Sequence, residues 1–250
     1  MEWGFLTTTH IITLIMAVLI IIGLYFLLKN KSEKTQFIIM FSLSFLGIAG
    51  ILWGFYYRDS IWEALPLHLC SLNAMMLPIA VYTKNKVINN LLLVWSLGAL
   101  IALVLNNEAA HYELLSLSFF FYYFPHVIEF GLPILMFTLK RAKLDVKCIL
   151  STVAITMGAY TVIHFINLWI NSSVAGVHVN YMFSLQPNNP VLELFISILP
   201  YQYWYMFLCI PVLVVYLSCI YCVQIKNIIV NTFKKTNQTK KSEELTEVKE

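Results

Sequence analysis

The residues best suited to chemistry fall in two short segments of an otherwise apolar chain. The segment LPLHLCSLN contains His68, Cys70 and Ser71, and the segment FPHVIEFGLP contains His126 and Glu129. A thiol or hydroxyl becomes a nucleophile when a neighbouring histidine accepts its proton. We therefore predict a catalytic set composed of His68, Cys70, Ser71 and His126.

Helical geometry limits which of these residues can act together. His68 and Cys70 are two apart, about 200° around a helix, so they cannot face one spot while both are helical. A Cys70 nucleophile would need its base from another span, and His126 is the first candidate. Near the helix start after Pro66, backbone N–H groups and the helix dipole can stabilise an anion or an oxyanion.

Further polar residues recur at helical spacing where an apolar span is expected. Tyr160, His164, Asn167 and Asn171 follow one another at intervals of four, three and four, which places them on one face. Such a face contacts protein or water, because polar groups are costly against lipid. We expect one histidine-lined pocket that opens outward, lined by Asn73, Glu129, Tyr160, His164, Asn167, Asn180 and Tyr181, with His10 nearby. The alternative for each residue is a hydrogen bond that holds helices together.

The elements that position these residues are transmembrane helices. Of the 250 residues, 60% are hydrophobic and 12% are charged, which is typical of a membrane protein. A helix needs about 20 apolar residues to cross the bilayer. We predict an all-α, polytopic seven-helix bundle, with spans at Thr8 to Leu28, Phe37 to Tyr57, Leu65 to Tyr82, Val87 to Leu105, Ser116 to Leu139, Val146 to Ile170 and Tyr203 to Ile225.

The charges between these spans predict the orientation. Lysine and arginine follow the first, third, fifth and seventh spans, whereas Arg58 alone lies in the other set of loops. That other set carries acidic residues, namely Asp59, Glu63, Glu108, Glu113 and Glu193. Because basic loops stay in the cytoplasm, the amino terminus is predicted outside and the carboxyl terminus inside.

The domain organisation follows from these spans. Residues 1–225 form one transmembrane domain, in which the outer loop 171–202 carries a short interfacial helix between Asn189–Pro190 and Pro200. Residues 226–250 pass from lysine-rich to glutamate-rich without apolar periodicity, so we expect a disordered cytoplasmic tail.

Three segments resemble a known family. LPLHLCSLN, FPHVIEFGLP and NYMFSLQPNNP, in a chain of this length, resemble the YwaF-like family of bacterial integral membrane proteins. That family is related to eukaryotic transmembrane protein 164, which moves fatty acyl chains onto lysophospholipids, and more remotely to the androgen-induced hydrolases of fatty-acid esters. The resemblance implies functional histidines at His68 and His126. It departs where the eukaryotic acyltransferases have a nucleophilic cysteine, because this chain has Leu67 there and its nearest thiol is Cys70.

The leading hypothesis is an acyltransferase or acyl hydrolase that acts on membrane lipids at the outer leaflet of a bacterial cytoplasmic membrane. One alternative is a carrier or receptor-like binder of a small polar ligand or lipid headgroup, with Glu129 and His126 as a proton-coupled pair. Another is an intramembrane zinc hydrolase that uses His68, His126 and His164. We expect membrane lipids as partners, no nucleic acid, and no cofactor or metal, because no trusted ligand spacing is present. The oligomeric state stays open.

Overall fold

The computed structural model describes residues 2–106 and 109–247, so Glu108 lies outside the described residues. Within them the fold is helical, apart from one isolated bridge between Glu2 and Glu113. The main helices are α1 (Thr8–Leu28), α2 (Glu33–Ser44), α3 (Leu46–Tyr57), α4 (Ile61–Ala64), α5 (Leu69–Thr83), α6 (Lys86–Leu105), α7 (Leu117–Thr138), α8 (Ile149–Ser173), α9 (Pro190–Ile198) and α10 (Ile210–Glu247). Short 3-10 turns are η1 (Val146–Cys148), η2 (Tyr181–Phe183) and η3 (Trp204–Cys209).

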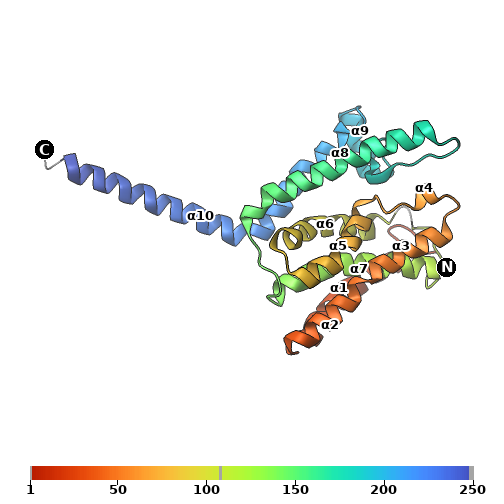
Figure 1. Cartoon of the computed structure of the whole chain (residues 1–250), viewed down its shortest axis with the longest axis horizontal. Helices are drawn as coiled ribbons and strands as arrows, with labels where there is room; N and C mark the ends of the chain where they lie inside the picture. Colours follow the sequence, from red (N-terminus) through yellow and green to blue (C-terminus); the bar gives the residue numbers. More distant parts are fainter. Residues whose placement is uncertain (1, 107–108, 248–250) are drawn as a thin grey trace.

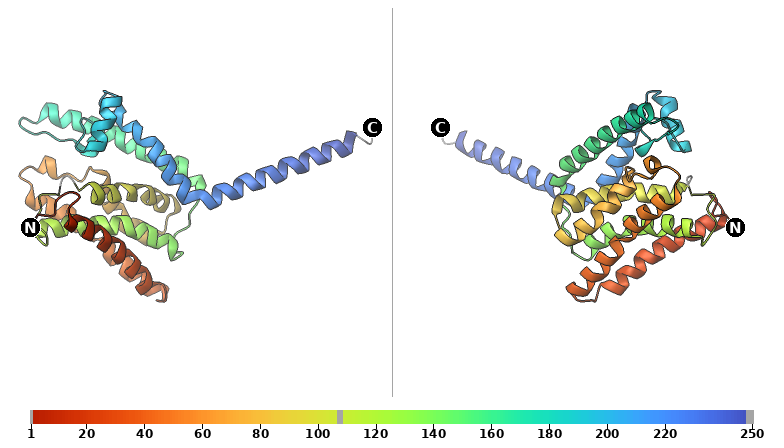
Figure 2. Two further views of the ribbon diagram at one scale, coloured as in Figure 1. Left: turned by 180° about the vertical axis from the view of Figure 1, so that it is seen from behind. Right: turned by 45° about the vertical axis from the view of Figure 1, so that its right-hand side comes forward.

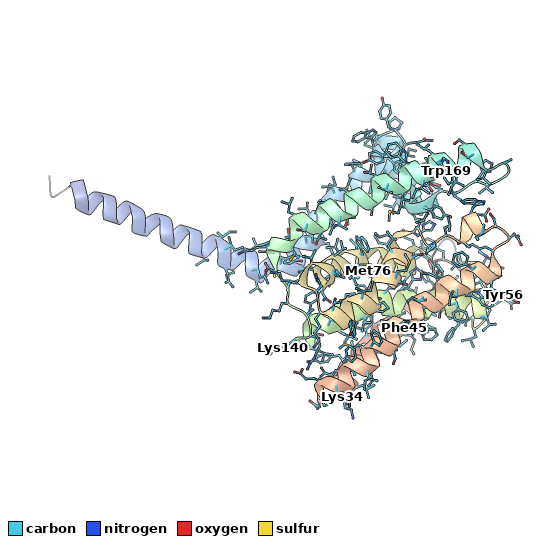
Figure 3. The ribbon with its side chains drawn as sticks, in the orientation of Figure 1. Lys34, Phe45, Tyr56, Met76, Lys140 and Trp169 are labelled. Carbon is cyan, nitrogen blue, oxygen red and sulfur yellow. The ribbon has the colours of Figure 1, made fainter. Side chains whose placement is uncertain are left out.

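Six helical segments in the described residues are long and apolar enough to cross a membrane, so the chain is a multi-pass membrane protein. Five agree closely with predicted spans, namely α1, α6, α7, η1 with α8, and η3 with the first part of α10. The sixth combines α2 and α3, which meet at Phe45 (Figure 3). This span starts at Glu33 rather than at Phe37, because Ser32 caps the helix by accepting a hydrogen bond from the Thr35 N–H.

The predicted third span is shorter in the structure than in the prediction. We expected Leu65 to Tyr82, but α5 begins at Leu69 and has 15 residues. Leu65 is extended, as the residue before Pro66 should be, and His68 is also extended, with ψ at 154°. The helix packs against α2, α3, α6 and α7 inside the bundle. The non-helical residues that precede it, from Leu65 to His68, are half-buried.

The two ends of the bundle differ in composition. Lys34 and Lys140 lie toward one end, here called the basic end, whereas Tyr56 and Trp169 lie toward the other, the aromatic end (Figure 3). The chain begins at the aromatic end, and α10 leaves the bundle at the basic end (Figures 1 and 2). Helix α4 lies at the aromatic end, and α5 begins farther inside the bundle (Figure 1).

Ion pairs join loops at the basic end. Arg141 pairs with Glu33 at 2.8 Å, and Lys86 pairs with Asp145 at 2.6 Å. The hydrogen bond from Lys86, together with one from the Lys147 backbone N–H, lowers the pKa of Asp145. These contacts tie the loop after α7 to the starts of α2 and α6.

The connection between α8 and α10 contains the predicted short helix. Asn189 caps α9 by accepting hydrogen bonds from the N–H groups of Val191 and Leu192, which confirms the predicted start. The last helix, α10, continues from Ile210 to Glu247. The lysine, glutamine and glutamate residues that follow Ile225 have good intrinsic helix propensity.

Candidate functional site

The structure brings Cys70, His126 and Glu129 together. One ligand atom from each of the three side chains lies within 4.8 Å of the others, although α5 and α7 are far apart in sequence. His126 and Glu129 are buried, at 8% and 3% exposure, and Cys70 is partly exposed. Helix α7 therefore places His126, the candidate base from another span, beside Cys70.

A backbone contact determines which nitrogen of the His126 ring carries the hydrogen. Its Nδ1 lies 2.6 Å from the carbonyl oxygen of Tyr122, one helical turn earlier. A carbonyl oxygen only accepts, so Nδ1 carries the hydrogen and donates it. The neutral ring then keeps its basic lone pair on Nε2, the atom a general base requires.

The Cys70 side of the site is the start of α5. Cys70 is the second residue of that helix, and His68, at the N-cap, makes no capping hydrogen bond with its side chain. The N–H groups of a first helical turn have no partners within their helix. This end of α5 thus favours negative charge on a thiolate or an oxyanion. Ser71 follows Cys70 by one residue and is rotated about 100° from it around the helix.

Asn73 bonds to the backbone of Glu129, and Gly47 leaves room for the Glu129 side chain. The Asn73 amide nitrogen donates to the backbone oxygen of Glu129 at 3.2 Å, and Asn73 is fully buried. Gly47 on α3 faces the carboxyl group: a Cβ atom there would lie 3.0 Å from Glu129 Oε1 and 2.5 Å from the Ala74 Cβ. The other carboxyl oxygen, Oε2, is buried without a hydrogen-bond partner among the described residues.

His68 instead lines a cleft formed with the connection after α8. The cleft has a volume of about 340 Å³. Its lining residues are Arg58, Glu63, His68, His178, Val179, Asn180, Tyr181, Phe183 and Asn188. The His68 ring lies 5.3 Å from the rings of both Tyr181 and Phe183. Burial raises the pKa of Tyr181 to about 12, so its hydroxyl stays neutral beside the cleft.

The polar stripe on α8 fastens this connection to the bundle. Asn167 donates to the Tyr181 carbonyl at 2.8 Å and accepts from the Tyr181 N–H at 3.0 Å. His164 Nδ1 lies 3.1 Å from Ser184 Oγ, and the Tyr160 hydroxyl donates to the Tyr203 carbonyl at 2.8 Å. The stripe faces protein, and its polar groups serve as hydrogen-bond partners of the loop.

The expected single histidine pocket is therefore divided. His68 and His164 contact the segment around Tyr181 and Ser184, whereas His126 joins Cys70 and Glu129. Among the described residues, the predicted zinc set of His68, His126 and His164 does not form a group of possible metal ligands. His10 uses both ring nitrogens, accepting from the Leu6 N–H and donating to the Leu103 carbonyl.

Sequence reasoning did not assign the cleft residues Arg58, His178 and Asn188. Arg58 carried a signal, because it is the one basic residue in loops that are otherwise acidic. His178 and Asn188 gave no such signal in the sequence, because their position in the cleft depends on how the connection after α8 folds. Asn180 was predicted, and it both lines the cleft and holds the loop by bonding to the backbone of Gln186 and Leu185.

Comparison with known protein families gives a match over most of the chain. The model of the TMEM164 family matches residues 5–221, which includes every site residue described above. Neither the curated proteins nor the solved structures contain a match to this chain. A match over most of the length establishes the family, and the chain belongs to the TMEM164 family.

Proposed function

We propose that this protein transfers or hydrolyses acyl chains of membrane lipids, with Cys70 as nucleophile and His126 as general base. The observation that carries the proposal is the convergence of Cys70, His126 and Glu129 from two helices. A thiol beside an oriented imidazole is the arrangement that nucleophilic acyl transfer requires. The membership of the TMEM164 family supports a membrane setting for that chemistry.

The proposed reaction has two steps. His126 Nε2 takes the proton of the Cys70 thiol, the sulfur attacks the ester carbonyl, and the imidazolium returns the proton to the departing lipid alkoxide. The acyl chain is then held as a thioester on Cys70. In the second step, His126 takes a proton from water or a lysolipid hydroxyl, which attacks the thioester and releases a fatty acid or a new ester. The proton returns to the Cys70 sulfur, and N–H groups at the start of α5 stabilise the oxyanion of both steps.

We also propose that α5 completes a seventh crossing, with the amino terminus outside and the carboxyl terminus in the cytoplasm of a bacterial cell. The lysines between spans support this orientation. The non-helical residues before α5, from Leu65 to His68, add length to its 15-residue helix and are half-buried. The site would then lie toward the outer leaflet, near the depth of glycerolipid esters.

The test is acyl transfer by the purified protein in phospholipid vesicles. A phospholipid with a labelled acyl chain is mixed with unlabelled lysophospholipid, and labelled fatty acid and labelled product are both measured. Cys70→Ala and His126→Ala should each reduce the rate by about 100-fold or more. Cys148→Ala removes a buried thiol outside the site and should leave the rate unchanged. Equal rates for wild type and the two site variants would refute the proposal.

A second candidate function is supported by the cleft that contains Arg58. A carrier or binder of a small polar ligand or lipid headgroup would use Arg58, His68 and Asn180 for recognition and Glu129 with His126 for proton coupling. Uptake of glycerophosphate into proteoliposomes under a pH gradient tests it. Uptake that Glu129→Gln abolishes favours a carrier, whereas absence of uptake in wild type removes this candidate.

A further inference from the structure

We propose that Cys70, His126 and Glu129 form a binding site for one divalent ion of the zinc class. The ligands are the Cys70 sulfur, Nε2 of His126 and one carboxylate oxygen of Glu129. Cysteine, histidine and glutamate are all common zinc ligands. Three protein ligands also leave a fourth position of a tetrahedral ion open to water or another small ligand.

The spacing of the three side chains suits such an ion. Their ligand atoms lie within 4.8 Å of one another. Zinc–ligand bonds of about 2.0 to 2.3 Å place the ligand atoms of a tetrahedral site about 3.3 to 3.8 Å apart. Rotation of the side chains toward a shared ion would close the remaining difference.

The buried carboxyl group of Glu129 is the second observation. Glu129 is 3% exposed, and its Oε2 has no hydrogen-bond partner within the described part of the chain. The two ion pairs found there, Lys86 with Asp145 and Arg141 with Glu33, do not involve it. A buried carboxylate is stabilised by a paired charge or a metal ion, so a cation between Glu129 and Cys70 would supply the missing partner.

The orientation of His126 fits the same role. Its Nδ1–H donates to the Tyr122 carbonyl, as metal-binding histidines commonly do, and this fixes the ring with Nε2 as the ligand atom. The partial exposure of Cys70 leaves one side of the site accessible. The thiol releases its proton when the metal binds. The metal and an acyl group would therefore exclude each other at Cys70.

This inference holds independently of acyl transfer, because it depends only on the three side chains. It is tested on the full chain in detergent micelles, without substrate, by adding Co²⁺ alone. We expect a thiolate-to-cobalt absorption band that saturates at one equivalent and disappears when Zn²⁺ is added. Cys70→Ser should abolish the band, and His126→Asn and Glu129→Gln should each weaken Co²⁺ affinity by about tenfold or more.

The exposed pair Cys219 and Cys222 on α10 is the matched control. A variant with both changed to serine should keep the band. A band that is absent in wild type, or one that survives Cys70→Ser and is lost in this double variant, would overturn the proposal. If Cys70→Ser fails to fold, alkylation of wild type decides: Zn²⁺ should protect Cys70 and not Cys209, and equal alkylation with and without Zn²⁺ would also overturn it.

Discussion

Asn73 on α5 donates a hydrogen bond to the backbone carbonyl of Glu129 on α7, at 3.2 Å. The usual partner of that carbonyl within α7 would be the N–H of residue 133, and Pro133 has none. The Asn73 amide thus satisfies a carbonyl group that Pro133 leaves without a donor. It also joins the two helices that carry Cys70 and His126.

This relationship predicts the outcome of a double-mutant cycle. Asn73→Ala should destabilise the protein by about 1–3 kcal/mol, because the Glu129 carbonyl then loses the donor that the Asn73 amide supplies. In a Pro133→Ala background, the new N–H of residue 133 restores a donor inside α7, so Asn73→Ala should cost less. Thermal unfolding of the four proteins in detergent measures both costs. Equal costs in the two backgrounds would show that Asn73 does not act through this carbonyl.

Close packing at Gly47 predicts a second effect. A Cβ atom at this position would meet the Ala74 Cβ at 2.5 Å and Glu129 Oε1 at 3.0 Å. Gly47→Ala should therefore destabilise the fold by about 1–3 kcal/mol and lower acyl transfer by displacing Glu129. Gly54→Ala, on the same helix, meets nothing within 4 Å and serves as the control. Unfolding and activity assays compare the two, and a Gly47→Ala protein as stable and active as the control would contradict this packing.

The stripe on α8 predicts how the connection after it is held. Asn167 is fully buried and bonds to both backbone groups of Tyr181. Asn167→Ala should cost about 1–3 kcal/mol and increase protease cleavage between residues 174 and 203, because those groups lose their partners. Ser172→Ala changes an exposed residue of the same helix and should have little effect. Limited proteolysis followed by mass spectrometry compares the two variants. Identical cleavage rates would show that the Asn167 hydrogen bonds do not hold the connection.

The loop at the basic end predicts a dependence on pH. The hydrogen bond from Lys86 lowers the pKa of Asp145 below its ordinary value. A lowered pKa adds stability above the ordinary aspartate pKa, and this is lost as the pH falls through the lowered value. Asp145→Asn should thus lower the melting temperature at neutral pH and have a diminishing effect in acid. Asp59→Asn is the control, and a difference that grew in acid would contradict the assignment.

The positions of most helices were predictable from the sequence because apolar length and turn residues act locally. The ends of α1, α6 and α7 agree with the prediction to within one residue, and Asn189–Pro190 marked the start of α9. The start of α5 differs from the prediction because Pro66 lies before the helix and not in its first turn, and His68 is extended. The break at Phe45 has no clear local signal.

The site was predictable only in part. Helical spacing separated His68 from Cys70 and pointed to His126 as the partner, and the structure brings Cys70 and His126 together. The His68 side chain contacts the segment around Tyr181, which lies more than 100 residues later in the chain. No local sequence pattern predicts a contact over that separation. The pairing of Asn73 with the Glu129 carbonyl likewise requires knowing that α5 packs beside α7.

The most direct test of the proposed chemistry is to find the acyl group on the protein. The protein is incubated with phospholipid vesicles, rapidly denatured in acid, digested and analysed by mass spectrometry. The proposal predicts a hydroxylamine-sensitive acyl thioester on the peptide that contains Cys70, present in wild type and lost in His126→Ala. An acyl group found only on another residue, or a Cys70 that stays unmodified while lipid is turned over, would contradict it.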